Sequence, residues 1–213
     1  MDVERRFDEA ARARVAEAVR RAEALSRGQI VPVLVEKSDP YPEARFRGAL
    51  LGAALGTLAV LLLELPLTLA ELPVLQAAAG LLGALVAMWD PAERLLLGRR
   101  AMDQAVRSRA LRAFHEEGLH KTSEGTGVLV FASLLERQAV VLGDHAIHAR
   151  MGDAGWGEAV EALVAGLRRD AADDGFVEAI ARCGARLAEH FPRDPAAAPP
   201  ANELEDAIRV RKD

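Results

Sequence analysis

Two long runs without charged side chains dominate the hydrophobic pattern of this chain. They cover residues 48–63 and 72–89. The acidic segment that connects them contains Pro66, and Pro73 follows at the start of the second run. At a rise of ~1.5 Å per residue, each helix would cross or nearly cross a hydrocarbon core of ~30 Å, and the shorter first run needs local thinning of the bilayer. The alternative is a buried hairpin in a soluble core, but two such runs in succession favour a transmembrane helical hairpin over residues 48–89.

Basic residues flank the predicted hairpin on both sides and are absent from its connecting segment. Lys37, Arg45 and Arg47 precede it, and five arginines follow it: Arg94, Arg99, Arg100, Arg107 and Arg109. Because Lys and Arg are retained on the cytoplasmic side, this distribution predicts that both termini are cytoplasmic. The high Ala and Arg content is typical of a GC-rich bacterial genome. We therefore expect a protein of the bacterial inner (cytoplasmic) membrane that contacts the lipid bilayer through two transmembrane helices.

Small residues recur at a spacing of four along both runs. The first run carries Gly48, Gly52 and Gly56. The second carries two rows at the same spacing, Gln76, Gly80 and Ala84, and Ala79, Gly83 and Ala87. Such stripes let two helix backbones approach closely in lipid, so the pattern favours packing of the two helices on each other within one chain. The alternative is a homo-oligomer that forms through Gly48, Gly52 and Gly56.

The segments before and after the hairpin predict regular elements. Apolar spacings of three and four over residues 3–22 predict an amphipathic helix that ends before Gly28. Residues 30–35 predict a strand, and Pro32, which has no N–H to donate, places that strand at a sheet edge or at a bulge. Residues 90–118 predict one long helix with Asp90 as its N-cap.

The C-terminal half predicts two more strands and two more helices. Residues 127–133 are apolar on both faces and predict a central strand, and residues 139–142 return as its hairpin partner. Helices follow over residues 156–167 and 176–191. The Pro- and Ala-rich stretch that begins at Arg193 predicts a flexible tail.

These elements describe one α/β domain that the hairpin divides. Residues 1–47 supply its first helix and strand, residues 48–89 the hairpin, residues 90–192 the remainder of the domain, and residues 193–213 the tail. A single strand is not stable alone, so the strand before the hairpin and the strands after it must share a sheet. Both flanks must then lie on one side of the membrane, as the charge distribution also predicts.

Composition excludes several classes of protein. The net charge of −5 does not fit a nucleic-acid-binding protein, which is usually basic. The single cysteine, Cys183, cannot form an internal disulfide, and its helical spacing predicts a small core residue. The charged N-terminal segment does not have the pattern of a cleavable signal peptide.

Three stretches resemble the TPM domain, a family also named TPM phosphatase. They are residues 28–33, 127–137 and 140–144, and the similarity continues through Trp156, the helix over residues 176–191, and residues 202–204. The division by a membrane hairpin is similar to a bacterial membrane-anchored subfamily. The resemblance implies the α/β fold class, as a small three-layer sandwich: a short mixed sheet of about three to four strands flanked by helices, interrupted here by a two-helix transmembrane hairpin.

The resemblance also implies a range of roles. Members of the family are associated with maintenance of membrane complexes, with receptors, and with acid phosphatase activity in plant relatives. Relatives that bind a divalent ion use an Asp-rich loop just before the central strand. In this chain that loop, residues 123–127, contains the single acid Glu124, which does not favour transfer of metal binding or phosphatase chemistry.

Acidic and imidazole side chains give the candidate site residues. Asp144, His145 and His148 follow a predicted strand end, with Asp153 close by in sequence, and Asp144 and His148 are the candidate catalytic residues. The alternative is that Asp144 caps a helix and that both imidazoles are solvated. The candidate ligands for a Ca²⁺ or Mg²⁺ ion are Asp144, Asp153, Asp173, Asp174 and Glu124, although Asp173 and Asp174 fit a helix N-cap more simply.

No enzyme signature stands out along the chain. A phosphate-binding P-loop, a nucleophile elbow and an HExxH zinc motif are all missing from the sequence. The sequence therefore favours an interaction, assembly or maintenance module for a membrane complex, with an unidentified membrane protein as partner, no nucleic acid and no required cofactor. The alternative is a divalent-metal-dependent phosphatase that acts on phosphate esters through Asp144, where the metal would activate water.

Overall fold

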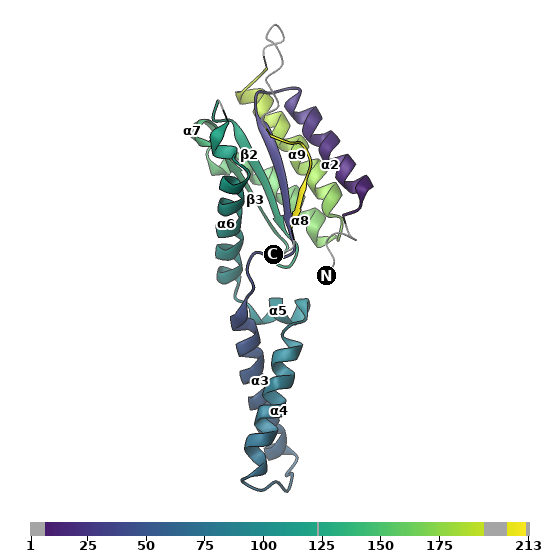
Figure 1. Ribbon diagram of the computed structural model, residues 1–213, viewed down its shortest axis with the longest axis vertical. Helices are drawn as coiled ribbons and strands as arrows, with labels where there is room; N and C mark the ends of the chain where they lie inside the picture. Colours follow the sequence, from purple (N-terminus) through teal and green to yellow (C-terminus); the bar gives the residue numbers. More distant parts are fainter. Residues whose placement is uncertain (1–6, 123, 194–203, 212–213) are drawn as a thin grey trace. The chain divides into compact units, whose positions relative to one another are not determined.

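The chain folds into two compact units. The computed structural model describes residues 7–122, 124–193 and 204–211. The hairpin unit is Pro40–Met102, and the sheet unit is formed by the residues before and after it (Figure 1). The hairpin unit is wider than the 48–89 segment expected from hydropathy, because it also contains a short helix and the first residues of the next one.

The sheet unit contains a mixed four-stranded sheet. Its strands are β1 (Gln29–Val35), β2 (Gly127–Ser133), β3 (Gln138–Gly143) and β4 (Arg209–Arg211), in the spatial order β3-β2-β1-β4. β1 pairs in parallel with β2 over its whole length, from Gln29 opposite Gly127 to Val35 opposite Ser133. β3 returns antiparallel to β2, as the hairpin pattern predicts, and β4 is parallel to β1.

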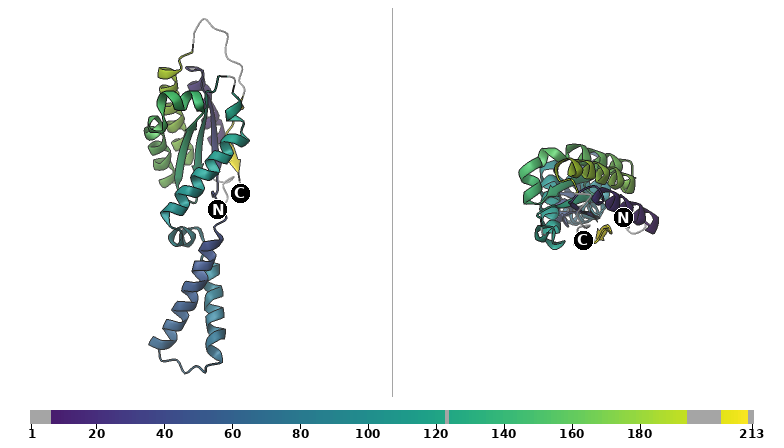
Figure 2. Two further views of the ribbon diagram at one scale, coloured as in Figure 1. Left: turned by 90° about the vertical axis from the view of Figure 1, so that its left-hand side faces the viewer. Right: turned by 90° about the horizontal axis from the view of Figure 1, so that it is seen from above.

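Helices cover both faces of this sheet, so the unit has three layers (Figure 2). Alternate strand residues such as Val31, Val33 and Phe131 pack against α6 (Arg99–Glu116) on one face. Residues between them, such as Leu34 and Val130, pack against α2 (Glu9–Glu23), α8 (Gly157–Arg168) and α9 (Ala172–His190) on the other. The predicted α/β sandwich with a short mixed sheet is confirmed.

Short elements complete the sheet unit. They are η1 (Leu119–Lys121), α7 (His145–Met151) and η2 (Asp153–Trp156). The N-terminal helix begins at Asp8, whose carboxylate accepts a hydrogen bond from the Ala11 N–H at 2.8 Å. The first residues of the helix predicted over 3–22 lie outside the described residues.

The expectation that Pro32 marks an edge strand is wrong. β1 lies between β2 and β4, and all seven of its residues are buried. Pro32 is tolerated inside the sheet because β4 is short and pairs with β1 only from Val33 onward. Pro32 therefore has β2 as its neighbouring strand, opposite Val130, and no residue of β4 opposite it.

The C-terminal segment is not a flexible tail where the structure describes it. Arg209–Arg211 form β4, and Ile208 is buried in the core beneath α2 and α9. Both arginines pair with carboxylates on and just after α6: Arg209 Nε lies 3.1 Å from Glu117, and Arg211 contacts both Glu116 and Glu117. Short strands of charged residues carry a weak sequence signal, and this one is stabilised by distant partners. Residues 194–203 lie outside the described residues.

The long helix expected over residues 90–118 is two helices. α5 (Asp90–Leu96) ends at Leu97, and α6 begins at Arg99 after Gly98. The N-cap of α5 is Trp89, not Asp90, and Pro91 occupies the first turn, where the missing N–H of proline is tolerated. Glycine in a helix interior is unfavourable, so the break at Gly98 has a local cause.

The hairpin unit consists of α3 (Pro42–Leu62), α4 (Glu71–Val86) and α5. Within the described residues, α3 is the one helix that is long and apolar enough by itself to cross a membrane. α4 is shorter, and it reaches that length only together with α5, from which it is bent by 105°. α3 and α4 lie side by side and separate toward their connection (Figure 2).

Candidate functional site

The predicted site residue Asp144 lies at the amino end of β2. Asp144 follows β3, which is antiparallel, and the Asp144 N–H donates to the carbonyl of Gly127 at the start of β2 (2.8 Å). Sites in open α/β sheets usually form at the carboxyl ends of parallel strands. The sequence argument took the end of β3 as the usual position of a site, but this end of the sheet is where the parallel strand β2 begins rather than ends.

Asp144 is the N-cap of α7. Its Oδ1 accepts a hydrogen bond from the His145 N–H at 2.7 Å and lies 3.3 Å from His145 Nδ1. The interpretation of Asp144 as a capping residue is confirmed. Asp144 is 8% exposed, and its Oδ2 is a buried acceptor that has no hydrogen-bond partner among the described residues.

The loop before β2 brings a glycine beneath the His145 ring. Gly125 has φ +65°, and a Cβ atom there would overlap the imidazole of His145. A side chain at this position would therefore be strained by the backbone and blocked by the ring. Glu124, one residue earlier, forms an ion pair with Arg27 at 3.1 Å. Gly125 of this loop therefore packs against the His145 ring, and Glu124 is paired with Arg27 rather than directed at Asp144.

The remaining predicted ligands do not gather with Asp144. Asp173 and Asp174 lie in the first turn of α9, where both carboxylates contact the guanidinium of Arg14 from α2, at 2.7 Å for Asp173. They are not the N-cap, which is Ala171, so the capping interpretation is wrong for this pair. The ion pairs tie α2 to α9. His148 is exposed on α7, and Asp153 lies in η2.

These side chains do not fit a calcium or magnesium ion. Such ions take six or more oxygen ligands, several of them from carboxylates. Among the described residues, no three His, Cys, Asp or Glu side chains gather closely enough to hold a metal. The Oδ2 of Asp144 alone would be a single protein ligand.

A second polar cluster lies at the carboxyl ends of β1 and β2, and sequence reasoning missed it. Glu136 is 3% exposed, its Oε1 accepts from the Ser38 N–H at 2.9 Å, and its Oε2 accepts from the Ser133 hydroxyl. Ser38 follows β1 and Ser133 ends β2, so one carboxylate joins both strand ends. The available signal was a serine that ends an apolar strand, with a glutamate three residues later in the turn.

Glu136 is placed to hold structure rather than to react. Its carboxylate is buried and accepts hydrogen bonds from the Ser38 N–H and the Ser133 hydroxyl. The next residue, Arg137, has φ 52° and completes the tight turn into β3. The cluster therefore fixes the turn after β2 against the segment that leads from β1 to the hairpin unit.

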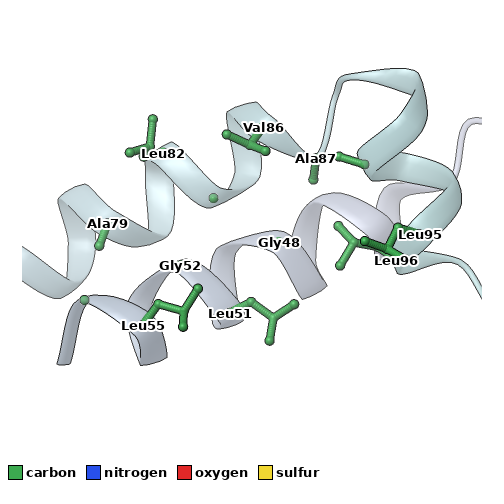
Figure 3. Close-up of a pocket in the computed structure, with 13 residues that line it drawn as sticks. Gly48, Leu51, Gly52, Leu55, Ala79, Leu82, Val86, Ala87, Leu95 and Leu96 are labelled. Atoms are coloured by element: carbon green, nitrogen blue, oxygen red, sulfur yellow. The ribbon is translucent and has the colours of Figure 1, made fainter. Parts of the chain in front are cut away.

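An apolar groove of about 480 Å³ runs along the helix pair of the hairpin unit (Figure 3). Its floor is formed by glycines of both helices, and its walls by larger side chains such as Leu51, Leu55, Leu82 and Val86. Ala92, Leu95 and Leu96 of α5 close one end. Every lining residue belongs to the hairpin unit, and none carries a polar side chain.

Comparison with known proteins agrees with this fold. Residues 96–186 match the model of the TPM domain. The BA42 protein from the psychrophilic bacterium Bizionia argentinensis, solved by NMR, is similar with a TM-score of 0.61 at 17% sequence identity, over 99% of each chain. At that identity the likeness shows a shared fold and no more. No curated protein matches this sequence. The resemblance to the TPM domain seen in the sequence is confirmed by this match over residues 96–186.

Proposed function

We propose that this chain is a membrane-anchored TPM-domain protein of the bacterial inner membrane and serves as an interaction, assembly or maintenance module for a membrane complex. The observation that carries the proposal is the position of the hairpin unit in the chain. It is inserted between β1 and α6, within the connection that joins two neighbouring parallel strands.

The pairing of β1 with β2 restricts the topology of any membrane crossing. If α3 crossed the bilayer alone, β1 and β2 would lie on opposite sides of it. They are instead paired residue by residue over seven positions. A crossing by α3 therefore requires a return by α4, which supports two spans with the sheet unit on one side. The excess of Lys and Arg on that side, against the acids Glu64 and Glu71 in the α3–α4 connection, supports a cytoplasmic location for both termini.

The surface of the helix pair supports a lipid environment. α3 and α4 expose many large apolar side chains, among them Leu51, Leu55, Leu58, Leu61, Leu62, Leu81, Leu82 and Leu85, each about half exposed or more. Monomeric soluble proteins rarely expose a continuous apolar surface of this extent. The hydrogen bond from Gln76 Nε2 to Thr57 Oγ1 (3.0 Å) satisfies polar groups of the two helices against each other, as the bilayer requires.

The sheet unit favours an interaction role because most of its candidate site carboxylates are already paired. Glu124, Asp173 and Asp174 are held in ion pairs, and Asp144 caps a helix. An anchor that keeps such a domain at the membrane surface raises its effective concentration near other membrane proteins. The partner expected from this arrangement is a protein of the same membrane.

Topology mapping in cells tests the proposal. Reporter fusions at Asp213 and at the N-terminus should both report the cytoplasm, and a tag between Glu64 and Glu71 should report the opposite side. The protein should stay in the membrane fraction after a carbonate wash. A tag in that connection that reports the cytoplasm, or a protein released by the wash, would refute the anchor. Crosslinking of the full chain in membranes, followed by mass spectrometry, then identifies the partner.

One observation favours the second candidate function, a metal-dependent phosphatase. The buried Asp144 Oδ2 has no hydrogen-bond partner among the described residues. Detergent-extracted full chain would be assayed on a generic phosphate ester with and without Mg²⁺ or Ca²⁺. Turnover that depends on the metal and is lost in Asp144→Asn would replace the interaction role with catalysis. Equal, background-level hydrolysis in both proteins would exclude the phosphatase.

A further inference from the structure

We propose that the hairpin unit binds an anionic phospholipid, with one acyl chain in the groove between α3 and α4 and the headgroup beside the arginines around α5. The inference rests on the proposed membrane anchor and adds to it a lipid class and a binding position. It draws on three features of the hairpin unit, which are the direction of α5, the charges around it, and the apolar groove.

α5 has the geometry and side chains of a helix that lies in the membrane surface. It turns away from α4 by 105°, so it cannot continue a span along the bilayer normal. Leu95 is 86% exposed, and Trp89 at its N-cap is 68% exposed. Tryptophan prefers the membrane–water interface, and exposed leucine on a short helix lying in that plane is placed to enter the acyl region. Phe46 on α3 is likewise exposed.

Cationic side chains surround α5. Arg45 and Arg47 near the start of α3, and Arg99 and Arg100 just after α5, are all exposed. Arg47 Nη1 donates to the carbonyl of Leu96 at 2.6 Å, which holds its guanidinium at the end of α5 next to the groove. The acids in the same segments are Glu43, Asp90 and Glu93, of which Glu93 is buried. The exposed charge is therefore mainly positive and complements a phosphate-bearing, anionic headgroup.

The groove fits a flexible chain better than a helix. It is lined only by apolar side chains, and α5 crosses its end through Ala92, Leu95 and Leu96 (Figure 3). A straight transmembrane helix laid along α3 and α4 would collide with α5, whereas an acyl chain bends around it. Leu96 lines the end of the groove that α5 closes, and Arg47 is hydrogen-bonded to the carbonyl of Leu96. A lipid with its chain in the groove therefore has its headgroup near Arg47.

Fluorescence of Trp89 tests this lipid contact in the full chain. The chain contains two tryptophans, and Trp156 is buried in the core of the sheet unit. The protein would be reconstituted in phosphatidylcholine vesicles with a minor fraction of phosphatidylglycerol, with bromine on the chains of one lipid or the other at equal total bromine. We expect brominated phosphatidylglycerol to quench more strongly. A Trp89→Phe protein, which keeps Trp156, should lose the quenching.

Variants separate the headgroup contribution from the chain contribution. Arg99→Gln/Arg100→Gln should reduce the selectivity for phosphatidylglycerol by about fivefold for each arginine, whereas the matched pair Arg168→Gln/Arg169→Gln in the sheet unit should not. Ala92→Phe fills the end of the groove and should also remove most of the selectivity. Leu111→Phe, which adds a ring at an exposed position on α6, is its control.

Each other outcome has a definite meaning. Equal quenching by both brominated lipids overturns the anionic-lipid proposal and leaves the anchor intact. The same conclusion follows if Arg99→Gln/Arg100→Gln keeps the selectivity as fully as the control pair does. Unchanged selectivity in Ala92→Phe refutes the groove as the site. Quenching that disappears as the protein-to-lipid ratio rises shows that a second copy occupies the groove. If neither brominated lipid quenches Trp89, the hairpin unit is not in the bilayer and the proposed function itself fails.

Discussion

Gly52 of α3 lies against the backbone carbonyl of Ala79 in α4, so closely that a Cβ atom on residue 52 would overlap that oxygen. Gly48 and Gly83 are related in the same way, each facing the other's carbonyl. The glycine stripe predicted from the sequence therefore packs within one chain in this structure. A homo-oligomer through Gly48, Gly52 and Gly56 remains a prediction, and it would require this contact to open.

Gly52→Ile should loosen the helix pair by about 1–2 kcal/mol, because the new side chain separates two backbones whose association depends on close contact. The measurement is disulfide crosslinking between Thr57→Cys and Gln76→Cys, whose native side chains are hydrogen-bonded at 3.0 Å. Burial raises the pKa of the Cys183 thiol to about 12, so the native cysteine stays protonated and does not compete.

Leu51→Ile is the matched control for that experiment. Leu51 is about half exposed and adds its bulk outside the contact with Ala79. Equal intramolecular crosslinking in the two variants would show that the glycine stripe is not the hairpin interface. A selective loss of intermolecular product would instead support the homo-oligomer.

Glu23 should make the sheet unit less stable as the pH rises toward neutrality. Burial, with a smaller contribution from the charge of Asp206, raises the pKa of Glu23 from 4.5 to about 7, although the Ile30 N–H donates to its carboxylate at 2.7 Å. The folded state then holds a proton that the unfolded state has released. The contribution of Glu23 to the free energy of unfolding is fully present below pH 4.5. It is lost as the pH rises through about 7, and the total loss is roughly 3 kcal/mol.

Denaturant unfolding of the full chain in detergent, followed by Trp156 fluorescence, measures this dependence. Glu23→Gln keeps an oxygen for the Ile30 N–H and should flatten the curve between pH 4.5 and 7. Glu17→Gln is the contrasting variant: hydrogen bonds from Arg20 and Arg21 lower the pKa of Glu17, so its contribution disappears as the pH falls. If wild type and Glu23→Gln show parallel curves, Glu23 is charged in the folded state.

Glu117→Ala should release the C-terminal strand. Glu117 is mostly buried and pairs with both Arg209 and Arg211, so its removal leaves two guanidinium groups without this partner at a cost of about 2 kcal/mol. Trypsin cleaves after arginine, and mass spectrometry should therefore show faster cleavage at both positions of β4. Glu178→Ala removes only an exposed pair with Arg182 and should leave the cleavage rate unchanged.

Asp144→Ala should destabilise the sheet unit by about 1 kcal/mol through loss of the α7 cap. Asp144→Asn should have little effect, because the amide oxygen still accepts from the His145 N–H and no buried charge remains. Trp156 fluorescence during urea unfolding reports the difference, since Trp156 packs near the end of β3. If the two variants lose equal stability, the carboxylate charge rather than the cap is what matters at this position.

Local pattern was sufficient for the elements whose partners are close in sequence. A run of residues apolar on both faces predicted β2, the apolar segment that follows it predicted the hairpin with β3, and helical spacing predicted α2, α8 and α9. β4 escaped prediction because its three residues form a strand only through distant groups, the exposed edge of β1 and the two glutamates near the end of α6. The edge-strand prediction from Pro32 was wrong for the same reason, since a proline is tolerated at this position only because β4 begins to pair after it.

The candidate site shows the same limit. The capping role of Asp144 is local and was predicted, whereas Asp173 and Asp174 take their role from Arg14 on a helix far away in sequence. Glu136 was missed because its two partners come from separate strand ends that only the parallel pairing of β1 and β2 brings together.

That parallel pairing delays formation of the sheet while the protein is being synthesised. During synthesis β1 is the first strand to emerge, all of its residues are buried in the folded protein, and residues 36–126 separate it from its neighbour β2. The strand on its other side, β4, comes last of all. Until the hairpin unit, α6 and then β2 have been synthesised, β1 has no partner strand on either edge. The sheet can therefore assemble only after the hairpin unit has been synthesised, and a chain that stops before that point leaves an unpaired apolar strand that proteases and chaperones can bind.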